Sequence, residues 1–181
     1  MKKTNRITGF LGMSALLCGL LALPVALAAA PVLQEDFEKG TVGEIERVPT
    51  AGDAKSPSIP PPVDEKSKWV GLILGDNKIG YQHTETGLKA GDKVTIKVSA
   101  INDNADGDPR GFVMQAYIKK PDNSVSRRMD VTSGSNRKWE TVKIEFTVEK
   151  DEASMDIIFL NGFKQSKSYV DDMVIDVTPA K

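Results

Sequence analysis

The chain has 181 residues, with 24 Lys and Arg against 25 Asp and Glu, and a formal net charge of −1. This balance disfavours nucleic acid, whose phosphates attract clustered basic residues, and offers no strongly basic surface to an anionic membrane. A single histidine and a single cysteine exclude a multi-histidine metal site and a disulfide within the chain.

The first 28 residues are typical of a secretory signal peptide. MKKTNRITGF is basic, LGMSALLCGLLALPVALAAA is apolar, and the A-x-A sequence that ends at Ala28 predicts cleavage there. An uncleaved anchor and a lipoprotein acylated on Cys18 are the alternatives, but Leu17 stands where a lipoprotein needs a small residue. Cleavage removes three basic residues and no acidic ones, which gives a charge of −4. We therefore expect a bacterial protein that is secreted, periplasmic or on the cell surface, with no membrane span after cleavage.

The mature region, 29–181, is long enough for one domain with a packed core. Its first strand is predicted over 32–37. The segment 40–66 is rich in Gly, Pro, Ser and charge, which is typical of a loop or linker, and we interpret it as a long loop of the same domain.

From residue 69 onward the sequence alternates apolar and polar residues with the period of a β-strand. In KVTIKVSA, for example, Val94, Ile96 and Val98 share one face. No segment of the mature region shows a convincing helical period, so we predict an all-β fold, a two-sheet antiparallel β-sandwich of the jelly-roll type over 32–177. The strands are expected at 69–74, 79–85, 93–100, 111–120, 139–148, 153–160 and 169–177. The predicted core consists of Val94, Ile96, Val98, Met114, Ile144, Phe146, Ile157, Phe159 and Ile175.

Several of these segments occur in an order that resembles a known family. GYQHTETGLKAGDKVTIKVSA, FVMQAYIKKPDNS, RKWETVKIEFTV and YVDDMVIDV follow one another as in carbohydrate-binding modules of the family 4 and 9 type. VLQEDFEKG resembles the first strand of such modules. The resemblance implies a galactose-binding-like jelly roll with its core at 32–39 and 69–177, and it implies carbohydrate as the partner.

The resemblance also suggests a partner for an acidic residue in the last strand. Asp171 shares its predicted face with apolar residues, and a buried carboxylate needs compensation. Modules of this type often hold a structural calcium ion between the first and last strands, which implies Glu38 and Asp171 as ligands, or Asp172 if a bulge exchanges the faces. The alternative is that Asp171 pairs with a lysine or a backbone amide. A second acidic segment, NDNADGDPRG, begins like a calcium-binding loop but lacks its key residues, so we interpret it as a turn.

Sugar rings present apolar faces to aromatic side chains and hydroxyl groups to planar polar ones. The outward face predicted for 113–119 bears an amide, an aromatic ring and an ammonium group, and the strand at 79–85 offers further polar and aromatic residues. The predicted ligand-binding residues are Tyr81, Gln82, His83, Gln115, Tyr117 and Lys119.

Three functions from different classes remain open. The first is a secreted, non-catalytic protein that binds poly- or oligosaccharide. The second is a structural or adhesive surface protein that uses the same sandwich for protein contacts or self-assembly. The third is a polysaccharide lyase that combines Tyr117, His83 and a basic residue. The sequence has no G-x-S-x-G nucleophile motif, and its acidic residues mostly fall in turns or on the outer faces of strands. We expect no catalysis.

Overall fold

The computed structural model of this chain describes residues 31–50, 64, 66–75, 78–104, 111–134, 137–164 and 166–181. The predicted signal peptide over 1–28 lies outside these residues, and so do Cys18, most of the predicted loop 40–66 and positions 105–110 of the second acidic segment. Within the described ranges there is no helix long and apolar enough to cross a membrane.

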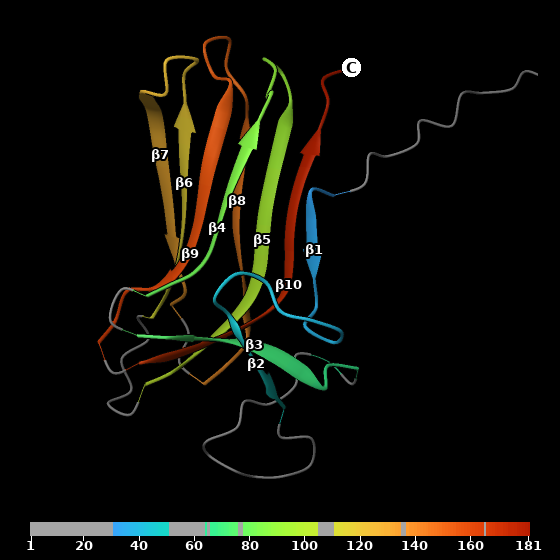
Figure 1. Cartoon of the computed structure of the whole chain (residues 1–181), viewed down its shortest axis with the longest axis vertical. Coiled ribbons are helices and arrows are strands. Elements are labelled where there is room, and N and C mark those ends of the chain that lie inside the picture. Colours follow the sequence, from blue (N-terminus) through green and yellow to red (C-terminus); the bar gives the residue numbers. More distant parts are fainter. Residues whose placement is uncertain are drawn as a thin grey trace, which may run out of the picture.

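The described strands form two antiparallel sheets, which we name sheet A and sheet B (Figure 1). Sheet A has the order β2-β3-β10-β5-β8, and β1 pairs with the part of β10 that follows its contact with β3. Sheet B has the order β4-β9-β6-β7. The bounds in sheet A are β1 Leu33–Glu35, β2 Glu46–Pro49, β3 Trp69–Leu74, β5 Lys93–Asp103, β8 Glu140–Thr147 and β10 Lys167–Thr178. Those in sheet B are β4 Lys78–Thr86, β6 Phe112–Lys119, β7 Val125–Thr132 and β9 Ser154–Asn161.

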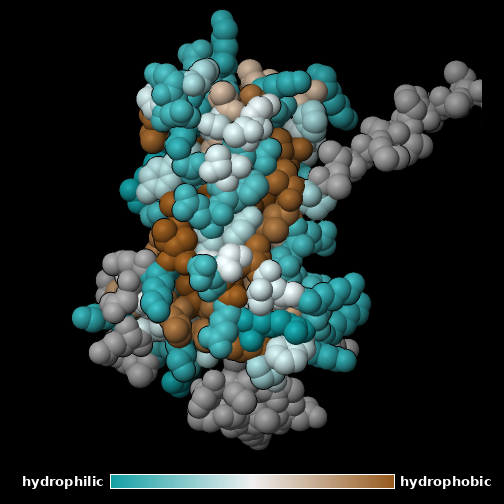
Figure 2. Space-filling model, viewed as in Figure 1, coloured by the Kyte–Doolittle hydropathy of each residue, from teal (hydrophilic) through white to brown (hydrophobic). Residues whose placement is uncertain are grey.

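The predicted sandwich is confirmed, and its core lies between the two sheets. All nine predicted core residues are buried. They join Phe112, Met155 and Met173 in one continuous hydrophobic cluster. Figure 2 shows hydrophobic residues between hydrophilic flanks on the face turned to the viewer. Burial of one face per strand follows from the period-two alternation of each segment.

Two strands were not predicted. β2 lies inside the segment expected to be a loop, and it is only four residues long with a proline at its end. β7 lies at the edge of sheet B, and most of its residues are partly or fully exposed. Neither strand contains a run of large apolar residues, because an edge strand buries little surface. Hydrophobic periodicity therefore gave no signal for them.

A β-bulge in β10 corrects the predicted face of Asp171. Asp171 pairs with Ser99 and Val174 pairs with Lys97, so β10 has one extra residue between these pairs, and Asp172 has a φ of 49°. The extra residue exchanges the faces from Met173 onward, whereas Asp172 itself is exposed. Met173 and Ile175 point into the core. Asp171 instead lies on the outer face of sheet A, together with Tyr169, which packs on Ile101 and Val70.

Candidate functional site

The outer face of sheet B presents two rows of mainly polar side chains across its four strands. Gln115, Tyr117 and Lys119 of β6 share this face, because Met114 and Ala116 alternate with them and are fully buried. Adjacent strands lie about 4.8 Å apart, so each row is roughly 14 Å long. The first row is Thr84, Asp156, Tyr117 and Arg128, and the second row is Gln82, Ile158, Gln115 and Asp130.

Tyr117 lies in the middle of this face and is partly exposed. Its hydroxyl donates a hydrogen bond to Oε1 of Gln115 at 3.2 Å. The guanidinium carbon of Arg128 lies 5.1 Å from the centre of the Tyr117 ring, within the range of a cation–π contact. Arg128 is itself held by Asp130, with Nε 2.9 Å from Oδ1. These contacts give the ring neighbours on its own strand and on β7.

A second group of contacts is centred on Asp156 of β9, which binds side chains of the two neighbouring strands, β4 and β6. Nζ of Lys119 lies 2.5 Å from Oδ2 of Asp156, and the hydroxyl of Thr84 donates to Oδ1 of Asp156 at 2.9 Å. Burial works to raise the pKa of Asp156, but the hydrogen bonds from Lys119 and Thr84 outweigh it and hold the pKa below its usual value. Asp156 is therefore an ionised acceptor with a fixed orientation.

The charges on this face neutralise one another in pairs. Lys119 is paired with Asp156, and Arg128 is paired with Asp130 at 2.8 Å. The two rows and Lys119 therefore contribute two positive and two negative charges. A face of this kind offers hydrogen-bond donors and acceptors without a net charge, which suits hydroxyl groups better than it suits a polyanion.

Two of the predicted binding residues lie on the opposite face of sheet B. Tyr81 pairs with Phe159, and the centres of their rings are 5.7 Å apart. His83 pairs with Ile157, stacks on Tyr81 with ring centres 6.3 Å apart, and places Nε2 3.0 Å from Oε2 of Glu85. Burial raises the pKa of Tyr81. Tyr81 and His83 therefore face the interior side of the sandwich.

The structure thus brings Gln82, Gln115, Tyr117 and Lys119 onto one face and separates Tyr81 and His83 from them. Tyr117 and His83, the pair that a lyase would combine, are on opposite sides of the sheet. Sequence reasoning missed five residues of the two rows. Alternation within 79–85 and 153–160 could have found Thr84, Asp156 and Ile158, whereas Arg128 and Asp130 lie on β7, the strand that was not recognised.

Asp171, the predicted calcium ligand, is 1% exposed and lies beside other acidic groups. Its Oδ1 accepts a hydrogen bond from the backbone amide of Asp172 at 2.9 Å. Burial raises the pKa of Asp171 to about 7, and the Asp172 and Asp36 carboxylates add to this effect. The Asp172 amide and the Ser67 hydroxyl act against it. A partner of Asp171 within the protein is thus a backbone amide, that of Asp172.

Glu38, the other predicted ligand, is engaged with the start of β3. Its Oε1 accepts hydrogen bonds from the backbone amides of Lys68 at 2.6 Å and Trp69 at 3.1 Å. Among the described residues, no group of three or more His, Cys, Asp and Glu side chains is arranged to hold a metal ion. Glu38 and Asp171 each accept hydrogen bonds from backbone amides, and calcium binding stays a prediction.

The second acidic segment begins inside a strand. Asn102 belongs to β5 and is fully buried. Its Oδ1 accepts hydrogen bonds from the backbone amide of Phe112 at 3.0 Å and from the hydroxyl of Ser168 at 2.9 Å. These bonds tie β5 to β6 of the other sheet and to the neighbouring β10, which is a structural role for Asn102.

No protein-family model and no curated protein sequence matches this chain. Solved structures do share its fold. A xylan-binding domain of carbohydrate-binding module family 22 aligns with a TM-score of 0.50 and 12% identity over 83% of this chain and 96% of that one. A structure described as a family 4 carbohydrate-binding module aligns with a TM-score of 0.43 and 19% identity over 75% of this chain and 89% of that one, and this score does not establish a shared fold.

The enzymatically active domain of tailspike protein 4 from bacteriophage CBA120 also aligns, with a TM-score of 0.50 and 8% identity. The alignment covers 76% of this chain but only 18% of the phage protein. At these identities the likeness concerns the fold. This chain therefore has a β-sandwich fold that is also found in carbohydrate-binding modules, and membership of family 4 or 9 stays a prediction.

Proposed function

We propose that this protein binds carbohydrate, without catalysis, through the outer face of sheet B. The observation on which the proposal rests is the placement of Tyr117 at the centre of two rows of oriented polar groups. An aromatic ring offers a surface for the apolar face of a sugar. Hydroxyl groups of the sugar would bind Gln115 and the carboxylate of Asp156. The xylan-binding domain with a similar fold supports this ligand class.

The internal charge pairing favours an uncharged glycan as the ligand. A glycan with carboxylate or sulfate groups would need cations that are free to bind it, and both cations of this face are engaged by carboxylates. The same pairing speaks against hydrolysis on this face. Glycosidases need one carboxyl group as an acid and a second as a base or nucleophile. Here Asp156 and Asp130 each neutralise a neighbouring cation.

Titration of the purified protein with soluble neutral polysaccharides, xylan and mixed-linkage β-glucan among them, tests the proposal by calorimetry or affinity electrophoresis. We expect binding to at least one of them. Tyr117→Ala should weaken this binding at least about tenfold, because truncation of a central aromatic residue typically costs more than 1 kcal/mol. Lys143→Ala is the matched control, since Lys143 is exposed on the outer face of sheet A.

Binding that is equal in Tyr117→Ala and in the wild type would place the ligand elsewhere on the protein. A folded wild-type protein that binds none of a broad panel of neutral and acidic glycans would contradict carbohydrate binding itself. The circular dichroism spectrum of each variant shows whether it is folded, so that a loss of binding is not confused with a loss of structure.

A further inference from the structure

The turn after β1 directs two backbone carbonyl groups toward one side chain. Phe37 has a φ of 56° and is fully buried, and its ring packs against Gly71 of β3. Nε of Arg47 donates to the carbonyl oxygen of Phe37 at 2.5 Å, and Nη2 of Arg47 donates to the carbonyl oxygen of Glu38 at 2.5 Å. One guanidinium group therefore holds two successive carbonyl groups of the turn.

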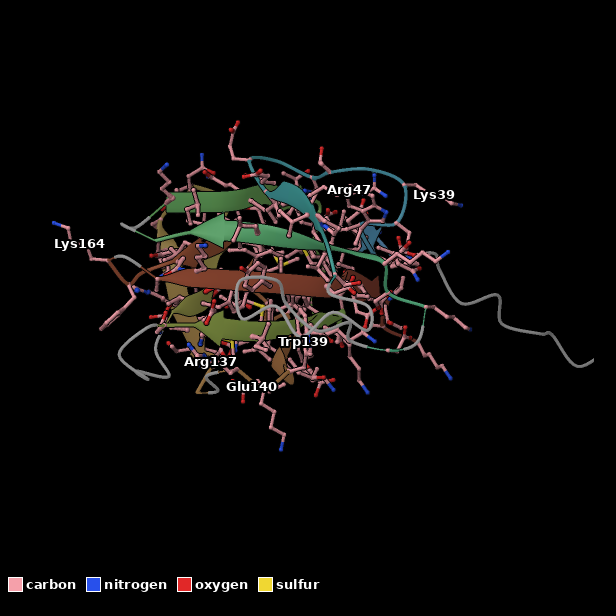
Figure 3. All side chains as sticks on the ribbon, turned by 90° about the horizontal axis from the view of Figure 1, so that it is seen from below. Lys39, Arg47, Arg137, Trp139, Glu140 and Lys164 are labelled. Atoms are coloured by element: carbon pink, nitrogen blue, oxygen red, sulfur yellow. The ribbon has the colours of Figure 1, made fainter. Side chains whose placement is uncertain are left out.

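Arg47 is fixed by its own surroundings. It belongs to β2, where it pairs with Gly71, and its guanidinium carbon lies 4.0 Å from the centre of the Trp69 ring. Figure 3 shows Arg47 on the side of the molecule where Lys39 follows the turn, away from Trp139. Stacking on an aromatic ring stabilises a guanidinium group and limits its freedom, so its donors are oriented before they meet the carbonyl groups.

The Glu38 carboxylate of this junction is also bound by the chain itself. Glu38 accepts the amides of Lys68 and Trp69, as described above. Ser67, the residue just before them, donates its hydroxyl to Oδ1 of Asp64 at 3.1 Å. The start of β3 therefore holds the Glu38 carboxylate, one of the two that a calcium ion was expected to join.

Carbonyl and carboxylate oxygens are the ligands that calcium prefers. Here the carbonyl oxygens of residues 37 and 38 bind a permanently charged guanidinium group, and the Glu38 carboxylate binds backbone amides. We propose that Arg47 takes the place of the cation at the junction between the turn after β1 and the start of β3. The fold then needs no metal at this junction, and its stability does not depend on calcium.

Thermal unfolding in calcium and in EDTA tests this proposal. We expect the wild type to melt at the same temperature in both, and calorimetric titration with calcium chloride to show no binding. Arg47→Met keeps an apolar chain next to Trp69 but loses every donor, so its melting temperature should fall by on the order of 10 °C in both solutions. Arg47→Lys keeps the positive charge but lacks the planar guanidinium group that donates to both carbonyl groups. Its melting temperature should lie between those of Arg47→Met and the wild type.

Arg137→Met is the matched control. Arg137 is exposed and pairs with Asp103 at 3.2 Å on the surface, so this change should lower the melting temperature by about 2 °C or less. A wild-type protein that melts at a higher temperature in calcium than in EDTA would overturn the proposal, and so would an Arg47→Met variant as stable as Arg137→Met. Should Arg47→Met fail to fold, Arg47→Lys and the calcium titration of the wild type decide the question.

Discussion

Single residues in this protein take their roles from surroundings that are distant in the sequence. The carboxyl group of Asp171 is shielded from water, and the carboxylates of Asp172 and Asp36 lie nearby, so its pKa rises to about 7. A raised pKa means that the folded protein binds this proton more tightly than the unfolded chain does. The stability that comes from the protonated form is therefore complete at acidic pH and is lost as the pH rises toward and through 7.

This sign gives a prediction for Asp171→Asn. The variant has no carboxyl proton to lose at position 171. In EDTA, its melting temperature minus that of the wild type should therefore rise as the pH is raised from 5 to 8. The comparison is made by thermal unfolding at several pH values. Asp176→Asn, on a partly exposed residue later in β10, is the control and should show no such trend. A difference between Asp171→Asn and wild type that stays constant over this pH range would contradict the assignment.

At the scale of the elements, the turn after β1 depends on a glycine in β3. A Cβ atom at Gly71 would lie 2.5 Å from Cγ2 of Ile45 and 2.6 Å from Cζ of Phe37. Both neighbours are buried and cannot move away freely. The missing side chain thus allows Phe37 to fill the core, and this in turn places its carbonyl group next to Arg47.

Gly71→Ala should therefore destabilise the protein by about 1–3 kcal/mol, the usual cost of overpacking a core. Chemical denaturation measures this as a lower midpoint. Gly40→Ala provides the comparison, because a Cβ atom there would meet nothing within 4 Å. If the two variants unfold at the same denaturant concentration, the packing of Phe37 under β3 is not tight.

The strands that sequence reasoning recognised and those that it missed differ in how much surface they bury. The central strand β5 alternates over eight residues and was predicted well, since each inward residue packs between the sheets. β2 and β7 are edge strands that are held largely by backbone hydrogen bonds to one neighbour. Backbone pairing leaves no trace in the hydrophobic pattern, so the polar residues that β7 adds to the candidate site could not be foreseen.

At the scale of the whole molecule, the sandwich separates two tasks. The outer face of sheet B has the exposed, charge-paired rows around Tyr117. Arg47 lies in sheet A, where it holds the junction between the turn after β1 and the start of β3. Variants at one place should leave the other unaffected, because no residue is shared between them. Arg47→Lys should accordingly bind polysaccharide like the wild type wherever it is folded, and Tyr117→Ala should melt near the wild-type temperature.

Export of the protein stays a prediction, because the first 30 residues lie outside the described part of the structure. The basic start, the apolar run and the A-x-A sequence predict that the exported protein begins at Ala29. N-terminal sequencing of protein recovered from the periplasm, cell surface or medium checks this. An intact Met1 or an acylated Cys18 would contradict cleavage after Ala28.

The sequence by itself determined the all-β class, most of the strands and the residues of the core, because alternation with a period of two shows which side of a strand is apolar. It also placed Gln115, Tyr117 and Lys119 together, since they alternate with buried residues on one strand. Only the tertiary structure decided which side of β4 Tyr81 and His83 take, where β10 inserts its extra residue, and that Arg47 meets Phe37 and Glu38. These features depend on strand register and on contacts between distant segments. A local pattern does not contain that information, because a shift of one residue reverses every side chain that follows.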